Sequence, residues 1–282
     1  MAVGNLLRIA CQSDALRQNV LVAAPSRTIA LGRRGLNQIG LGTNRLTNTA
    51  ENRSFLEAAI GAGVNFVDTA HLYAGGESEG AIGMALAPFA DDLVVATKGG
   101  YHRGGGTEGL RKELETSLER LRTDTIALYY LHRVDPDVPL RETMSLLKEY
   151  RDAGRITHVG LSEVSVEQIQ RARSVVPIAA VQNEYNLSER GSDEVVEYCT
   201  SESITFVPFY PLHGDKSPVV AEIARRHEAT PSEIRLAWLL HRSPVMLPIP
   251  GTLSLQHLKE NLGALEIELS AADFETLSAL AS

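Results

Sequence analysis

Short runs rich in β-branched and aromatic residues alternate with longer segments of helical periodicity from residue 27 to the end of the chain. Each run ends in glycine, proline or a polar residue, as buried parallel strands do. The predicted strands are Gln38–Thr43, Asn65–Ala70, Leu93–Gly99, Ile126–His132, Ile156–Ser162, Ile178–Asn183, Thr205–Tyr210 and Val245–Pro250.

The segments between these runs are predicted to be helices. Pro231 opens one of them at a position that proline favours, and Gly63 and Gly154 follow the ends of two others. The clearest apolar stripe, with steps of four, four and three residues, is formed by Leu110, Leu114, Leu118 and Leu121.

Eight strands alternating with helices predict an α/β protein with the (β/α)8 TIM-barrel fold. The alternative, a doubly wound open sheet, usually carries a glycine fingerprint after its first strand, and Gly40–Arg45 lacks the third glycine. Leu31-Gly32 and Gly35-Leu36 predict a short N-terminal hairpin that plugs one end of the barrel. We therefore expect an N-terminal extension at 1–26 and a barrel at 27–282.

Composition limits the classes of partner. The chain has 282 residues, with 27 Lys and Arg against 35 Asp and Glu, and a net charge of -8 argues against non-specific nucleic-acid binding. No run approaches the roughly 18 apolar residues of a membrane span. Cys11 and Cys199 lack metal-site spacing, which predicts free thiols in a reducing, cytoplasmic compartment. The oligomeric state is not predicted.

Four titratable residues fall where a barrel carries its chemistry, at the carboxyl ends of strands. Asp68 ends the second predicted strand and Tyr73 follows it by five residues, while Lys98 and His132 end the third and fourth. Because these strands are neighbours, the four side chains are expected to share one cleft.

This set of residues suits the reduction of a carbonyl group. A free tyrosine has a pKa of about 10, and a neighbouring lysine ammonium is expected to lower it. Asp68 would pair with Lys98, and His132 could orient a carbonyl oxygen. No side chain can supply hydride, so a nicotinamide cofactor is implied, whereas no metal is.

The chain resembles the aldo-keto reductase superfamily over roughly residues 27–282. The resemblance lies in a series of blocks whose order and spacing are highly specific: 63–73 (GVNFVDTAHLY), 76–79 (GESE), 96–98 (ATK), 130–132 (YLH), 160–162 (GLS), 181–183 (VQN), 249–252 (IPGT) and 260–261 (EN). It implies an NADP(H)-dependent reductase of aldehydes or ketones, working reversibly, with Tyr73 as proton donor and Asp68, Lys98 and His132 completing a tetrad.

The resemblance also implies that NADP lies extended across the barrel mouth. Its expected contacts run from the nicotinamide to the adenosine end in this order: Gly42, Thr43, Asp68, Ser162, Glu163, Gln182, Phe209, Tyr210, Pro211, Leu212, Gly214, Gly251, Thr252, His257, Glu260 and Asn261. An open substrate pocket is expected beside it, lined by Leu72, Tyr101 and His102.

Three departures from the family pattern concern the cofactor. Phe209 replaces a frequent Tyr, which preserves stacking on the nicotinamide. Glu163 stands where the family often has Asn, and its carboxylate can still accept from an amide. At the expected 2′-phosphate site many members carry Lys and Arg, whereas this chain has Gly251 and His257. NADP(H) is therefore favoured by resemblance, and NAD(H) is an alternative.

Two other classes of function remain open. Some relatives of this fold are regulatory subunits of ion channels, so a non-catalytic subunit that senses a nicotinamide cofactor is one. A metal-dependent barrel hydrolase or isomerase is the other, but it would need several His and carboxylate ligands at strand ends, where only Asp68 and His132 qualify.

Overall fold

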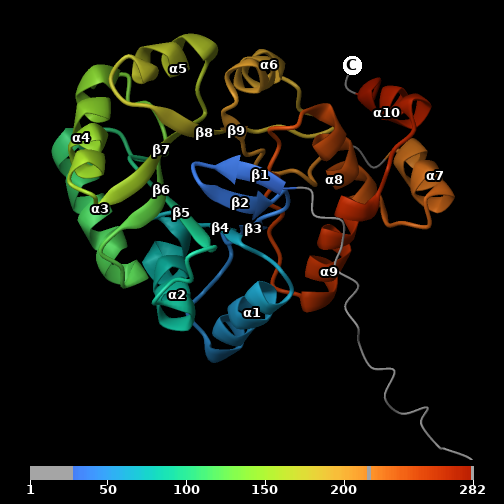
Figure 1. Ribbon diagram of the computed structural model, residues 1–282, viewed down its shortest axis with the longest axis horizontal. Helices are drawn as coiled ribbons and strands as arrows, with labels where there is room; N and C mark the ends of the chain where they lie inside the picture. Colours follow the sequence, from blue (N-terminus) through green and yellow to red (C-terminus); the bar gives the residue numbers. More distant parts are fainter. Residues whose placement is uncertain (1–27, 215–216, 281–282) are drawn as a thin grey trace, which may run out of the picture.

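The computed structural model describes residues 28–214 and 217–280, and within these ranges seven parallel strands form one curled sheet in chain order (Figure 1). The predicted extension at 1–26 lies outside the described residues, so the domain division stays a prediction. The strands are β3 (Leu41–Gly42), β4 (Phe66–Asp68), β5 (Val94–Gly99), β6 (Ile126–Leu131), β7 (Ile156–Ser162), β8 (Ile178–Gln182) and β9 (Thr205–Phe206).

The eighth predicted strand closes the barrel as an extended segment with isolated bridges. Residues 245–251 lie between β9 and β3, where Leu247 N donates to Phe206 O at 2.9 Å and Gly42 N donates to Pro250 O at 3.3 Å. Pro248 and Pro250 have no N–H to complete a regular ladder, which explains why this strand is irregular. The predicted (β/α)8 architecture is confirmed.

Helices surround the sheet (Figure 1). They are α1 (Ala50–Gly61), α2 (Glu77–Leu86), α3 (Gly106–Leu121), α4 (Leu140–Asp152), α5 (Val166–Arg173), α6 (Asp193–Glu202), α7 (Pro218–Arg226), α8 (Pro231–Arg242), α9 (Leu255–Gly263) and α10 (Ala271–Ser278), with short 3₁₀ helices η1 (Tyr73–Gly76) and η2 (Ala264–Glu266). All four leucines of the predicted stripe are buried on α3, as expected. No helix in the described ranges is long and apolar enough to cross a membrane.

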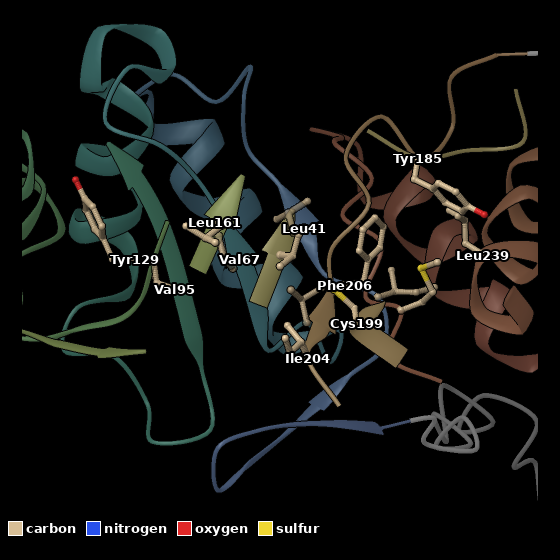
Figure 2. Packing of buried hydrophobic residues seen from close by; sticks show 14 of the residues in the cluster. Leu41, Val67, Val95, Tyr129, Leu161, Tyr185, Cys199, Ile204, Phe206 and Leu239 are labelled. Carbon is tan, nitrogen blue, oxygen red and sulfur yellow. The ribbon is translucent and has the colours of Figure 1, made fainter. Parts of the chain in front are cut away.

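Apolar side chains fill two layers, one inside the barrel and one between the sheet and the helices. Leu41, Val67 and Val95, labelled in Figure 2, belong to the outer layer, in which strand residues pack with helix residues such as Leu239. The predicted hairpin, β1 (Thr28–Leu31) with β2 (Arg34–Asn37), lies across the middle of the ring in Figure 1. Its Leu31 and Leu36 pack into the inner layer and close the end of the barrel opposite the strands' carboxyl ends.

Candidate active site

A cavity of about 560 Å³ opens at the carboxyl ends of the strands. Most of the expected site residues line it: Gly42, Thr43, Asp68, Leu72, Tyr73, Tyr101, His132, Ser162, Gln182, Phe209, Tyr210, Pro211, Leu212 and Gly251. Residues spread over more than 200 positions of the chain thus meet in one place, because parallel strands end at the same rim.

Lys98 lies in β5 at the base of this cavity, where its ammonium contacts Asp68, Thr69 and Tyr73. Its Nζ is 2.5 Å from Asp68 Oδ1 and donates to Thr69 O at 2.7 Å, while Tyr73 Oη lies 3.4 Å away. The side chain is fully buried. A buried ammonium held by these acceptors has one fixed position, from which it faces the Tyr73 phenol.

The backbone conformation of the segment after β4 directs the Tyr73 side chain into the cavity. Ala74, Gly75 and Gly76 all have positive φ, and the tight turn they form places Tyr73 at the start of η1. Arg120 on α3 stabilises the segment from His71 to Glu79. Its Nη1 donates to His71 O at 3.0 Å and forms an ion pair with Glu79 at 3.3 Å.

Glu79 is fully buried and connects Arg120 to β5, the strand that carries Lys98. Its Oε1 accepts a hydrogen bond of 2.6 Å from Thr97 Oγ1, next to Lys98 on β5. Gly76 leaves room for the Arg120 guanidinium, since a Cβ at this position would lie 2.2 Å from it. Arg120 was not expected from the sequence, where it is one more charged residue on the exposed side of a helix.

The Lys98 ammonium lowers the pKa of Tyr73, as expected, but it does not bring that pKa below its ordinary value. Burial raises the pKa of Tyr73 above 10.0, and the Lys98 ammonium opposes this only in part. Burial would also lower the pKa of Lys98, but the charge of Asp68 holds it above its ordinary value. Tyr73 is consequently a neutral phenol and Lys98 a cation across the physiological range.

His132 is a neutral imidazole. Burial, together with the positive charges of Lys98, Arg133 and His102, lowers the pKa of His132 to about 2. Its ring makes an edge contact with Tyr73, with 6.1 Å between centroids. Nδ1 is buried and has no hydrogen-bond partner in the described part of the chain. A neutral histidine beside a phenol can hold a carbonyl oxygen without competing for its proton.

The cavity suits an extended anionic cofactor with an aromatic end. Phe209 and Tyr210 present rings to it. Gln182 Nε2 donates to Asp68 Oδ2 at 2.8 Å, which links the ends of β8 and β4 across the barrel mouth. Asp68 is the single acid among the described lining residues and is already paired with Lys98. Arg45, near Gly251, adds a positive charge that favours a ligand with phosphate groups, and Arg133 adds a second positive charge beside His132.

Several expected cofactor and substrate residues do not line this cavity: Glu163, Gly214, Thr252, His257, Glu260, Asn261 and His102. The Glu163 carboxylate accepts from Glu184 N at 2.9 Å, and His257 is exposed on the first turn of α9. Thr252 lines a small depression adjoining the cavity, together with Arg45 and Leu253. The roles given to these seven residues stay predictions, as do the roles given to the residues that line the cavity.

The structure adds lining residues that sequence reasoning missed, namely Asn44, Arg45, Arg133, His213, Ile249 and Pro250. Arg45 comes two residues after Thr43 and Arg133 directly follows His132, so in each case the sequence signal was closeness to a predicted site residue. The direction of a loop side chain is set by the tertiary fold, however, and adjacency alone could not show that both arginines face the cavity.

Comparison with known proteins agrees with this geometry. The sequence model described as the aldo/keto reductase family matches residues 38–282. An uncharacterized oxidoreductase of Schizosaccharomyces pombe is 37% identical over 276 residues, covering 90% of each chain. Pyridoxine 4-dehydrogenase of Escherichia coli is 32% identical and covers 90% of this chain and 98% of its own.

Solved structures show the same fold. A thermostable aldo-keto reductase, Tm1743, in complex with the inhibitor epalrestat superposes with a TM-score of 0.83 at 32% identity, covering 90% of this chain and 99% of the other. An aldo/keto reductase of Klebsiella pneumoniae in complex with NADP and acetate gives a TM-score of 0.80 at 28% identity, covering 90% and 95%. The similarity extends over nearly the whole barrel.

Proposed function

The chain belongs to the aldo/keto reductase family, and on that premise we propose that it reduces aldehydes or ketones to alcohols, reversibly, with NADPH. The observation that carries this proposal is the placement of Tyr73 Oη 3.4 Å from a buried lysine that is itself held by Asp68, in a cavity also lined by His132. That arrangement is a proton donor with a fixed cation behind it.

The chain's own residues would supply the proton to the carbonyl oxygen and stabilise the negative charge that its transfer leaves on Tyr73. Tyr73 would donate its phenolic proton to the carbonyl oxygen while the neutral His132 holds that oxygen in place. Lys98 would stabilise the phenolate left on Tyr73, and Asp68 keeps the ammonium in position. The nicotinamide, when bound, would supply the hydride.

The cofactor assignment rests on the lining residues and on the neighbours. We place the nicotinamide against Phe209 and near Ser162 and Gln182, and the pyrophosphate along Tyr210–Leu212. The two structures from Klebsiella pneumoniae are complexes with NADP and NADPH, which supports NADP(H) here and leaves NAD(H) as an alternative. The site would be completed at the two ends of the cofactor by Glu163, Gly214, Thr252, His257, Glu260 and Asn261.

We also propose a cytoplasmic location and a small-molecule carbonyl compound as the partner. Cys199 is a free and buried thiol, and free cysteines are typical of a reducing compartment. Cys11 lies outside the described residues. The metal-dependent alternative lacks a ligand set in residues 28–214 and 217–280, where no group of three or more His, Cys, Asp or Glu could hold an ion.

Turnover separates the reductase from a non-catalytic cofactor sensor. NADPH and NADH are titrated by fluorescence, and a panel of aldehydes, including pyridoxal because of the Escherichia coli relative, is followed by loss of reduced-nicotinamide absorbance. Tyr73→Phe is the matched control: it should bind cofactor as the wild type does and lose kcat by about 10² to 10⁴-fold. Cofactor binding without turnover of any carbonyl or alcohol would favour the sensor.

A further inference from the structure

Arg133 is a positively charged side chain in the cavity wall that the proposed reaction does not use. It follows His132 directly, beyond the end of β6. Its guanidinium carbon lies 5.5 Å from the centroid of the Tyr101 ring, and that ring lies 4.9 Å from the imidazole of His132. Arg133 is therefore next to two side chains that face the expected substrate.

The charge of Arg133 has no anionic partner among the described residues. Its Nη1 donates to two neutral acceptors, His132 O at 3.0 Å and Ser162 Oγ at 3.3 Å. Asp68, the one acid on the described cavity wall, is occupied by Lys98 and Gln182. A half-buried guanidinium with free N–H groups is a good binding site for a carboxylate, which it can hold through two parallel hydrogen bonds.

The cofactor does not supply the missing anion at this position. Its phosphates are expected along Tyr210–Leu212 and near Gly251, where Arg45 lies, with Nη2 donating to Gly251 O at 3.2 Å. Arg133 instead contacts Ser162, which is expected to hold the uncharged carboxamide of the nicotinamide. An anion at Arg133 must then belong to the second ligand, the carbonyl compound.

Resting on the proposed function, we propose that Arg133 binds a carboxylate on the substrate, so that the preferred substrates are aldehydes or ketones that also carry a carboxylate. Tyr73 and His132 would hold the carbonyl oxygen at one end of such a molecule. The ring of Tyr101, which contacts both His132 and Arg133, would pack against the carbon skeleton between the two groups.

The test compares an acid with its uncharged ester. kcat and KM are measured with NADPH for 4-carboxybenzaldehyde and for methyl 4-formylbenzoate, in the wild type, Arg133→Met and Arg133→Lys. Arg103→Met is the control, because Arg103 is an exposed arginine in the loop after Tyr101 that does not line the cavity. Cofactor affinity is measured separately by fluorescence, and benzoate binding to the enzyme–NADPH complex by calorimetry.

We expect the wild type to prefer the acid by about tenfold or more in kcat/KM. Arg133→Met should lower kcat/KM for the acid about 10 to 100-fold, chiefly through KM, and change the ester less than about threefold. Arg133→Lys should keep part of the preference, and Arg103→Met should keep all of it. In each variant NADPH affinity should stay at the wild-type value.

Other results would overturn the inference. Equal losses for acid and ester together with weaker NADPH binding would make Arg133 a positioning residue that acts through Ser162. A wild type without preference for the acid would remove the carboxylate site altogether. If no carbonyl compound is turned over but benzoate binding still depends on Arg133, the proposed reaction fails and the anion site stands.

Discussion

Lys98 Nζ lies 2.5 Å from Asp68 Oδ1, and both side chains are buried at the base of the cavity. This ion pair orients the ammonium that faces Tyr73, and the Asp68 charge partly offsets the ammonium's positive field. Burial raises the pKa of Tyr73, and the Asp68 charge adds to that rise, so Tyr73 keeps its proton in the resting enzyme. The lysine matters most after the proton has left, when a phenolate needs a counter-charge.

Lys98→Met should lower kcat by at least about 10²-fold in steady-state assays, because the phenolate formed on Tyr73 would lose that counter-charge. The variant should also be less stable to urea by about 3–5 kcal/mol, since it leaves Asp68 as an unpaired buried charge.

The double variant Asp68→Asn, Lys98→Met separates the two effects. It removes the unpaired charge, so stability should largely return while kcat stays low. A double variant that regained both stability and turnover would show that Lys98 acts only through folding.

The depressed pKa of His132 should appear in the pH dependence of stability. An unfolded histidine takes up a proton near pH 6.5, whereas in the folded state the pKa of His132 is about 2. The stability contribution is thus fully present above pH 6.5 and is lost as pH falls through the window toward 2. At pH 5, 1.5 units below 6.5, the loss is about 2 kcal/mol.

His132→Gln removes this group and is the comparison for that measurement. Urea unfolding at pH 7.5 and pH 5 should show a drop in unfolding free energy that is smaller in the variant by about 2 kcal/mol. Identical drops in the two proteins would mean that His132 protonates normally in the folded state.

Arg120 should affect catalysis from outside the cavity. Arg120→Gln would release His71 O and the buried Glu79, and with them the turn that aims Tyr73. We expect kcat to fall about tenfold in steady-state kinetics while KM and cofactor affinity change little. Arg120→Lys, which keeps the charge, should recover part of the rate. A change confined to thermal stability would make Arg120 a structural residue only.

The sequence could predict the strands and the four central residues because both signals are local. Strand runs carry their own composition, and Asp68, Lys98 and His132 are read off strand ends. The properties that depend on burial or on distant partners could not be predicted. The raised pKa of Tyr73 reflects desolvation that no motif encodes, and Arg120 reaches its partners from a helix that begins 30 residues after η1.

Cofactor preference shows the same limit, because Arg45 brings a cation to a region where the sequence suggested none. It lines the main cavity with Pro211 and Leu212 as well as the depression beside Thr252. Arg45→Gln should weaken NADPH and NADH binding by a similar factor, about tenfold, because the pyrophosphate is common to both cofactors. That factor corresponds to about 1.4 kcal/mol, close to the lower end expected for a charge-assisted hydrogen bond.

Fluorescence titration of both cofactors checks this prediction, with His257→Arg as the contrasting variant. His257 is exposed on the first turn of α9, near the expected 2′-phosphate, so an arginine there should tighten NADPH binding and leave NADH unchanged. The two variants therefore change different quantities. Arg45→Gln should change the affinities for both cofactors, whereas His257→Arg should change the ratio of the NADPH and NADH affinities. If Arg45→Gln weakens NADPH alone, Arg45 contacts the 2′-phosphate rather than the pyrophosphate, and it is the residue that selects NADPH.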